Sequence, residues 1–304
     1  MKQPETALVV SIHDRLLNKA KAENRSFNEL LQYYSMERFL YRVSRSPHRD
    51  KFVLKGGLML KLWEASFARP TLDIDLLGKL ENREDLITKT IATVCNQAAV
   101  PDGMVYDADT MKVERITEDA YFQGLRVRLQ GYLGPSRVML QLDIGYGDPV
   151  LPAPEVVIYP TLLDLPAPQL LGYSKESTIA EKLEAMISLG MLNSRMKDYY
   201  DLWYLSRHFS FSGEMLAAAI RSTFEHRGTV LSADPSILSQ QFAEESSKVI
   251  LWRAFRDRTR LEDAPENLAD VLEVLRAFLL PILEHIVNGH AFSQLWNSSI
   301  GWSE

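Results

Sequence analysis

The sequence predicts an α+β fold, in which a mixed β-sheet with flanking helices is followed by a helical C-terminal part. Short apolar runs that alternate with polar residues occur between residues 52 and 146, whereas apolar residues recur at helical spacing from residue 175 onward. Six prolines between residues 149 and 168 mark an extended connection between the two patterns. We therefore expect a first domain over residues 1–168, with its own N-terminal helices, and a helical domain over residues 169–304.

Composition and charge restrict the class of protein. The 304 residues are 46% hydrophobic and 24% charged, which is typical of a soluble globular protein with a sizeable core. No apolar run approaches the roughly 20 residues of a membrane span, so we expect no membrane partner. The single cysteine, Cys95, favours a cytoplasmic location. The net charge of −6 argues against a protein that coats nucleic acid non-specifically.

Helices are expected both before and after the first strand along the chain. Residues 8–22 and 26–46 have helical periodicity, and Ser26 followed by Glu29 is typical of a capping box at the start of the second helix. Both helices are expected to pack against the sheet. A further helix is expected over residues 82–98, with Asn82 as its cap.

The stretch over residues 52–77 ends in a strand that carries two acidic residues, Asp73 and Asp75. Because successive side chains of a strand point to opposite faces, these two carboxylates share one face, while Leu72, Ile74 and Leu76 take the other. Carboxylates held this close repel each other unless a cation lies between them or one takes up a proton. A hard divalent ion, Mg²⁺ or Mn²⁺, that is shared with substrate phosphates would satisfy both.

A glycine pair earlier in the same stretch predicts the other half of a phosphate site. Gly56 and Gly57 form a turn that opens a helical segment over residues 58–64, and glycines before a helix N-terminus let backbone N–H groups approach an anion. Lys55 and Arg69 flank the turn with positive charge. An Asp-x-Asp alone is usually a solvated strand edge, and a glycine pair alone is usually only a turn. The two together, separated by a helix-length insert, indicate a nucleotide site.

A third acid is expected on a later strand. Strand-like runs cover residues 111–117, 121–132 and 136–146, and the last two are joined by a plausible hairpin turn at residues 134–136. Asp143, near the end of the third run, is the candidate for a remaining metal ligand or a general base. It could instead begin the turn before Gly145, and Asp148 competes weakly for the same role.

The helical half contributes a lysine and an aspartate. Lys182 lies on the apolar stripe of a helix over residues 175–190 and needs a partner there, which could be a substrate phosphate; the alternative is a lysine that extends to solvent. Asp198 lies in the first turn of the next helix, where capping alone could explain it. Near Lys182 it could orient that lysine, with Asp201 in the same network. For the arginine-rich run over residues 252–260, a solvated helix face is favoured over an RNA contact.

These motifs together resemble a known family. The strand, glycine turn, helix and Asp-x-Asp strand resemble the DNA polymerase beta-like nucleotidyltransferase superfamily. The Lys-Gly-Gly turn at residues 55–57, R-x-T-x-D-x-D at 69–75, IAEKLEAM at 179–186 and R-x-K-D-x-x-D at 195–201 are similar to the AbiEii/AbiGii toxin family, which includes the MenT toxins. The resemblance covers roughly residues 50–206, with four separated motifs in the family's order.

The resemblance implies a Mg²⁺-dependent enzyme that transfers a nucleoside monophosphate from an NTP, encoded beside an antitoxin in a bacterial toxin-antitoxin or phage-defence system. Some relatives add nucleotides to the 3′ end of tRNA. By position, Asp73 and Asp75 match the metal-binding pair, Lys182 the essential helix lysine and Asp198 the aspartate after it, and Arg195 joins the nucleotide-binding candidates. Leu58 stands where many members have Ser or Thr, which removes a possible hydrogen bond to phosphate.

The mechanism expected from these roles is in-line attack of an acceptor hydroxyl on the α-phosphorus, at a metal held by Asp73 and Asp75. Asp143 either completes that metal site or accepts the proton of the attacking hydroxyl. Two alternatives stay open. In the first, the acceptor is a protein hydroxyl. In the second, the fold has become a binding or regulatory module without activity; the intact acids and Lys182 weigh against it.

Overall fold

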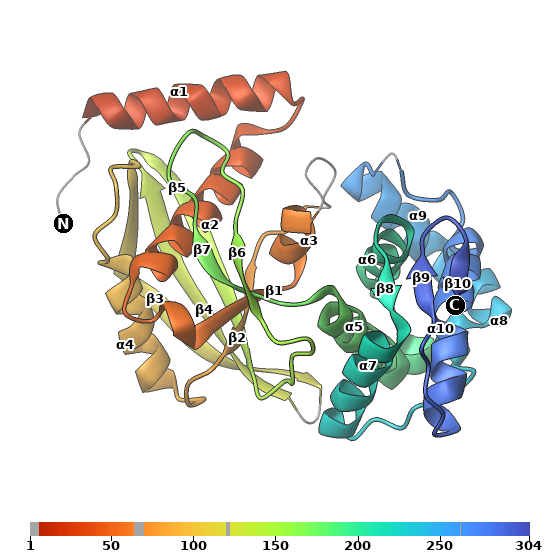
Figure 1. The fold of residues 1–304 in the computed structure, drawn as a ribbon. Helices are drawn as coiled ribbons and strands as arrows, with labels where there is room; N and C mark the ends of the chain where they lie inside the picture. Colours follow the sequence, from red (N-terminus) through yellow and green to blue (C-terminus); the bar gives the residue numbers. More distant parts are fainter. Residues whose placement is uncertain (1–5, 64–69, 120–121, 262) are drawn as a thin grey trace. The chain divides into compact units, whose positions relative to one another are not determined.

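The computed structural model describes residues 6–63, 70–119, 122–261 and 263–304. The chain forms two compact units (Figure 1). The first contains Met1–Gly147 and Glu155–Gly172, and the second contains Asp148–Pro154 and Tyr173–Glu304. This division differs from the one expected at residues 168 and 169 by a strand over Gln169–Gly172, which lies in the first unit, and by the segment Asp148–Pro154, which lies in the second.

The first unit is built on a seven-stranded mixed sheet with the strand order β3-β4-β5-β2-β1-β7-β6. β2 pairs with β1 in antiparallel fashion and with β5 in parallel fashion, so it lies in the middle of the sheet. The strands are β1 (Phe52–Lys55), β2 (Ile74–Gly78), β3 (Met104–Asp119), β4 (Phe122–Leu133), β5 (Ser136–Tyr146), β6 (Glu155–Ile158) and β7 (Gln169–Gly172). The predicted α+β class is confirmed, and the unit's core lies between this sheet and its helices.

Helices α2 and α4 cover one face of the sheet (Figure 1). α2 (Phe27–Arg45) packs against β5 and β7, α1 (Thr6–Ala22) packs on α2, and α4 (Glu84–Cys95) packs on β3. The predicted cap of α2 is confirmed, because the Ser26 hydroxyl accepts a hydrogen bond of 3.2 Å from the Glu29 N–H. The predicted cap of α4 is wrong. That helix begins at Glu84 after Arg83, with acidic residues in its first turn, where the helix dipole favours them.

Alternation along β4 and β5 explains why one face of the sheet is apolar and the other polar. Leu140, Leu142 and Ile144 of β5 are fully buried on the helix-covered side, and the residues between them point to the opposite side. β3 begins at Met104, seven residues before the predicted run. A register shift between Asp107 and Lys112 interrupts its alternation, so the periodic pattern that identifies a strand is lost there.

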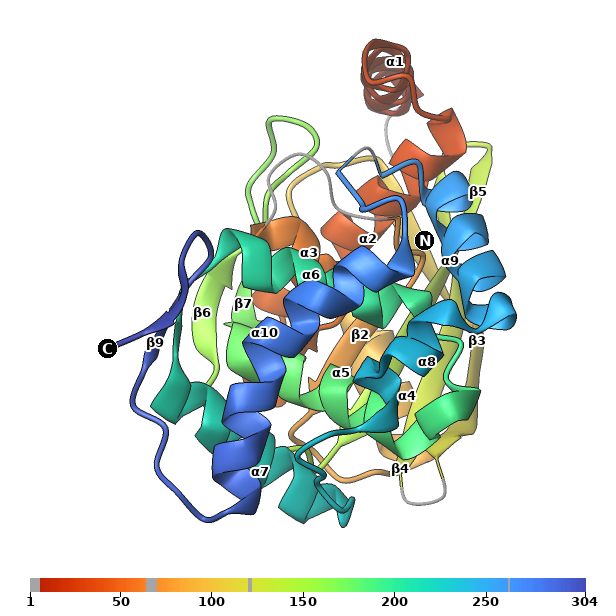
Figure 2. The same cartoon turned by 90° about the vertical axis from the view of Figure 1, so that its right-hand side faces the viewer.

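The second unit is mainly helical, as predicted, and α10 packs against α6 and α7 in its core (Figure 2). Its helices are α5 (Lys175–Leu189), α6 (Met196–His208), α7 (Gly213–Arg227), α8 (Gln240–Glu244), α9 (Ser246–Thr259) and α10 (Leu268–Val287). Short 3₁₀ turns are η1 (Arg49–Lys51) in the first unit and η2 (Gly190–Leu192) and η3 (Ser236–Leu238) in the second. The helix predicted over residues 175–190 is confirmed as α5. It begins after Ser174, whose hydroxyl accepts a hydrogen bond from the Ser177 N–H, and it ends before Gly190, which has a φ of +52°.

The sequence did not predict the small sheet that closes the second unit. β8 (Phe211–Ser212), β9 (Leu295–Asn297) and β10 (Gly301–Ser303) pair in the order β10-β9-β8. Strands of two or three residues are too short to show a period. Trp296 is buried and donates to the Ser206 carbonyl at 2.7 Å, so the C-terminal residues pack on the helices. Within the part of the chain that the structure describes, no helix has the length and apolar character that a bilayer span needs.

Candidate active site

Three neighbouring strands align charged residues on one face of the central sheet. Lys55 of β1 is the register partner of Asp75 of β2, and Asp75 is the register partner of Asp143 of β5. Directly paired residues of adjacent strands point to the same face of a sheet. The strand order therefore brings Asp143 beside Asp75, although 68 positions separate them in the sequence.

Asp73 joins this group from just outside the strand. The sequence predicted a strand over residues 72–77, but β2 begins at Ile74 and Asp73 lies in the bend before it. The prediction that Leu72 shares the buried face of Ile74 and Leu76 is therefore wrong. Leu72 is 68% exposed, whereas Ile74 and Leu76 are fully buried. The bend is held by Thr71, whose hydroxyl donates to Asp73 Oδ1 at 2.8 Å and whose N–H donates to the Tyr33 hydroxyl at 3.0 Å.

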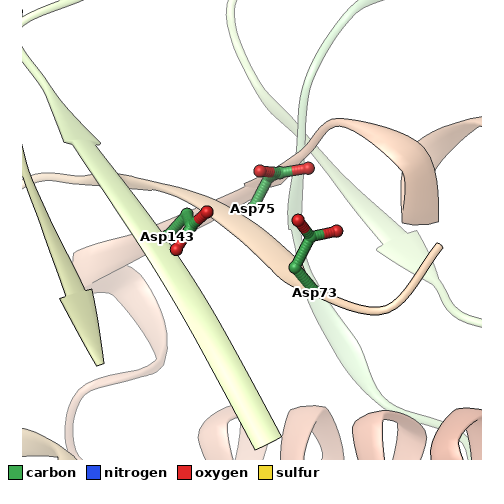
Figure 3. Close-up of side chains that lie close together, drawn as sticks. All are labelled: Asp73, Asp75 and Asp143. Carbon is green, nitrogen blue, oxygen red and sulfur yellow. The ribbon is translucent and has the colours of Figure 1, made fainter. Parts of the chain in front are cut away.

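The three carboxylates form one cluster, called the acidic triad below. Each of Asp73, Asp75 and Asp143 offers one oxygen, and these oxygens all lie within 4.8 Å of one another. Figure 3 shows the three side chains directed toward a common space. Oxygen ligands at about 2.1 Å from a Mg²⁺ ion lie about 4.2 Å apart when they are opposite each other. The donor set and its spacing therefore fit a hard divalent ion after small side-chain rotations.

Asp143 has a cationic partner that the sequence did not single out. Arg126 of β4 is its register partner and forms a bidentate pair with it, in which Nε donates to Oδ1 and a terminal nitrogen donates to Oδ2, both at 2.7 Å. Gln141 Nε2 also donates to Oδ2, at 3.3 Å. The alternation of Arg126 and Arg128 along the polar side of β4 was visible in the sequence. Their partners were not, because strand register is set by tertiary pairing.

The Gly56-Gly57 turn lies directly against the triad. Gly56 has a φ of +66°, and a Cβ placed on it would lie 1.9 Å from Asp75 Oδ2 and 2.7 Å from Asp75 Cβ. A Cβ on Gly57 would lie 2.8 Å from the Thr71 hydroxyl oxygen. α3 (Gly57–Trp63) begins at this turn, as the sequence predicts. Only glycines allow the backbone to approach Asp75 and Thr71 this closely.

Substituting Gly56 by alanine is expected to reduce the nucleotidyl transfer that the sequence predicts by about 100-fold or more, because displacing a reacting group by about 1 Å costs this much. Rotation of the Asp75 carboxylate does not relieve the clash, since the Asp75 Cβ is itself too close. Gly228→Ala is the matched control: Gly228 has the same φ of +66°, and a Cβ placed on it would have nothing within 4 Å. Transfer of a labelled nucleotide is measured beside thermal melting. Equal activity of the two variants would show that the Gly56 contact does not matter.

A second cluster of charged residues lies within the second unit. Lys182 Nζ of α5 lies 2.7 Å from Asp198 Oδ1 and 2.6 Å from Asp201 Oδ2, both on α6. Arg195 Nε donates to Asp198 Oδ2 at 2.6 Å. Both aspartates are fully buried, and the Lys182 side chain is 12% exposed. Lys182 therefore does not extend to solvent, and the contact that the sequence indicated between Lys182 and Asp198 is present.

The electrostatics of this cluster favour its ionised form. Burial pushes the pKa of Asp198 upward, but the charges of Lys182 and then Arg195 outweigh it and hold that pKa well below its ordinary value. Asp198 is therefore a buried anion at neutral pH, and its negative charge fixes the position of the Lys182 ammonium. Asp198 also lies in the first turn of α6, where the helix dipole stabilises the carboxylate further. The ion pairs show that capping this helix is not the only role of Asp198.

The remaining candidates are distributed as follows. Lys55, Gly56 and Gly57 lie with the acidic triad in the first unit, and Lys182, Arg195 and Asp198 lie together in the second. Arg69 lies outside the described residues. Asp148 is in the second unit, where the Arg227 guanidinium donates to its Oδ1 at 3.0 Å.

The aromatic residues of the arginine-rich run belong to the core of the second unit. Trp252 and Phe255 of α9 are 1% and 4% exposed, whereas Arg253 and Arg258 are exposed. The aromatic rings therefore do not form a surface for stacking nucleic acid bases, and the arginines belong to a solvated helix face.

Comparisons with known proteins give one family match and similar solved structures. The model of a protein family described as the nucleotidyl transferase AbiEii toxin, type IV toxin-antitoxin system, matches residues 38–275. No curated protein matches the chain. The crystal structure of JHP933 from Helicobacter pylori is similar with a TM-score of 0.48 and 15% identity over 87% of this chain and 94% of that chain. A second H. pylori crystal structure, provisionally assigned as a nucleotidyltransferase, has a TM-score of 0.47 and 16% identity over 87% of this chain and 96% of that chain.

The family match covers most of the chain, and it includes the glycine turn, all three acids of the triad and the cluster around Lys182. The chain therefore belongs to the AbiEii toxin family and is a nucleotidyltransferase.

Proposed function

We propose that this protein is the toxin of a bacterial toxin-antitoxin system that acts in phage defence, and that it transfers a nucleoside monophosphate from an NTP to the 3′ end of tRNA. The acidic triad carries the proposal, because three clustered carboxylates beside a glycine turn suit metal-dependent phosphoryl chemistry. The AbiEii family match supports the toxin role. A cognate antitoxin is the proposed protein partner, and the cytoplasm is the proposed location.

Asp73, Asp75 and Asp143 are the residues that would hold Mg²⁺ or Mn²⁺. A bound divalent ion would supply positive charge at the triphosphate, where negative charge accumulates during transfer. For Asp143, the structure supports a ligand role more than a base role. Each of its oxygens already accepts a charge-assisted hydrogen bond from Arg126, which fixes the carboxylate in place.

The nucleotide-binding residues are proposed from the turn and from the family's motifs. The backbone of Gly56 and Gly57 suits close approach of phosphate, and Lys55 shares the face of Asp75. Arg69, Arg195 and Lys182 are proposed to contact the nucleotide, and Asp198 is proposed to position Lys182 through their 2.7 Å contact.

The reaction is a single displacement. The acceptor hydroxyl oxygen forms a bond to the α-phosphorus as the bond from that phosphorus to the bridging oxygen of pyrophosphate breaks, and the hydroxyl proton is released to solvent. The protein's contribution is to orient the triphosphate and to stabilise the charge that develops on it.

This proposal is tested by incubating the purified protein and Mg²⁺ with each of the four α-labelled NTPs. The acceptor in each reaction is either total tRNA or total protein. We expect label in tRNA with one or a few NTPs, and sequencing of tRNA 3′ ends then identifies the added nucleotide. Label in protein alone would replace the tRNA acceptor by a protein hydroxyl. Absence of label from both, with any of the four NTPs, would favour a binding module without activity.

A further inference from the structure

Arg126 stands beside the acidic triad without a role in the family motifs described above. Its guanidinium is bound side-on to Asp143 through two hydrogen bonds of 2.7 Å, and the Arg126 side chain is 26% exposed while that of Asp143 is 9% exposed. A bidentate arginine-carboxylate pair of this geometry is strong and directional. The third acid of the triad is therefore held by a fixed positive charge.

From this arrangement we infer that Arg126 is a positioning residue that orients Asp143 and weakens binding of a divalent ion to the triad in the nucleotide-free enzyme. The inference rests on the proposed function of the triad as the metal site. A carboxylate has about four lone-pair positions, and the guanidinium uses one on each oxygen. The Gln141 amide takes the second position on Oδ2. Asp143 can then give the ion Oδ1 while it stays paired, but it cannot bind the ion through both oxygens.

Charge determines the direction of the effect. The triad brings three negative charges into a space in which the ligand oxygens lie within 4.8 Å of one another, and Arg126 offsets one of them. Its guanidinium also repels a divalent ion bound at the neighbouring aspartates, because unit charges a few ångströms apart interact appreciably even at a solvated protein site. Removal of the guanidinium therefore strengthens the attraction between the triad and a cation.

The biochemical consequence is that the ion binds well only together with the triphosphate. The negative charges of an NTP outweigh the repulsion by Arg126, so the site favours a metal-nucleotide complex over a free ion. One side chain of β4, Arg126, thereby makes binding of the metal ion depend on binding of the triphosphate.

Arg128 provides a matched control. It lies two residues along the same strand, so it points to the same face as Arg126, and it is likewise paired: Nε with Gln141 at 3.0 Å and a terminal nitrogen with Glu114 at 2.6 Å. Replacing Arg128 removes the same charge from the same strand and no direct contact of Asp143, which Arg128 reaches only through Gln141.

Binding of Mn²⁺ is measured by electron paramagnetic resonance, without nucleotide, for the wild type and for Arg126→Met, Arg126→Lys and Arg128→Met. We expect the Kd of Arg126→Met to fall by about tenfold, and that of Arg128→Met to stay within about twofold because its charge is farther away. Arg126→Lys keeps the charge and stays near the wild type. Loss of a merely structural residue would weaken binding, so unchanged or weaker binding by Arg126→Met overturns the inference.

Asp73→Asn, alone and combined with Arg126→Met, separates this inference from the proposed function. If Asp73→Asn abolishes binding in both backgrounds but Arg126→Met does not tighten it, the metal site stands and only the role of Arg126 is wrong. If Arg126→Met binds tightly and the added Asp73→Asn has no effect, the ion is not at the triad, and both the inference and the proposed metal site are wrong.

Discussion

Substituting Asp73 by alanine is expected to abolish nucleotidyl transfer and to leave the protein folded. Asp73 lies in a bend outside β2 and is partly exposed, so little of the packing of the first unit depends on its side chain. Removing a carboxylate that holds a divalent ion removes several kcal/mol of charge stabilisation from the reaction. This corresponds to a loss of about 10³-fold or more in kcat.

The measurement is incorporation of labelled nucleotide under saturating NTP and Mg²⁺, with thermal melting as the test of folding. Asp164→Ala is the control, because the Asp164 side chain is fully exposed and its one ion pair among the described residues is a 3.5 Å contact with Arg15. We expect its activity to equal that of the wild type. Transfer retained by a folded Asp73→Ala protein would remove the basis of the proposed mechanism.

Substituting Lys182 by methionine is expected to have the largest effect on stability as well as to abolish transfer. Lys182 is the shared partner of two fully buried aspartates, at 2.7 Å from Asp198 and 2.6 Å from Asp201. Removing one member of a buried ionic group leaves uncompensated charge and costs about 3–5 kcal/mol in the free energy of unfolding. Lys197→Met removes an exposed positive charge next to Asp198 and is expected to change stability by no more than about 0.5 kcal/mol.

The stability deficit of Lys182→Met should depend on pH. In the wild type the pKa of Asp198 is lowered, so its contribution to stability is present above the ordinary value of 3.8 and is lost as the pH falls through the folded-state value. In the variant, burial is opposed only by the remaining positive charges, so the pKa of Asp198 rises and the folded state takes up a proton more readily. The deficit in unfolding free energy of the variant relative to the wild type should therefore become smaller as the pH is lowered from neutral toward the ordinary carboxyl value of 3.8. A constant difference in urea unfolding across this range would contradict this account.

A compensated variant separates the structural role of Lys182 from its proposed role in transfer. Lys182→Met combined with Asp198→Asn and Asp201→Asn removes the buried negative charges together with their partner, and we expect it to recover much of the lost stability. Transfer should stay lost, because no ammonium is present to contact the nucleotide. If this variant regained activity along with stability, Lys182 would be a structural residue only.

Local sequence patterns predicted those parts of the fold that depend on local spacing. The Ser26 cap, the helix that begins at Gly57, the helix between Ser174 and Gly190 and the strand over Ser136–Tyr146 all have periodic or capping patterns that a few residues specify. The small sheet of the second unit and the first half of β3 escaped prediction. In the sheet the strands are too short for a period, and in β3 a register shift interrupts the alternation.

The candidate site divides in the same way. The sequence by itself determined which residues are candidates: Asp73 and Asp75 two residues apart, the glycine pair before them, and Lys182 and Asp198 within helical motifs, because each is a matter of residue type and short-range spacing. Only the tertiary structure decided the partners. Parallel pairing of β2 with β5 brings Asp143 beside Asp75, and antiparallel pairing of β4 with β5 brings Arg126 onto Asp143. Strand order and register are set by the packing of the whole sheet, so no local stretch of sequence contains them.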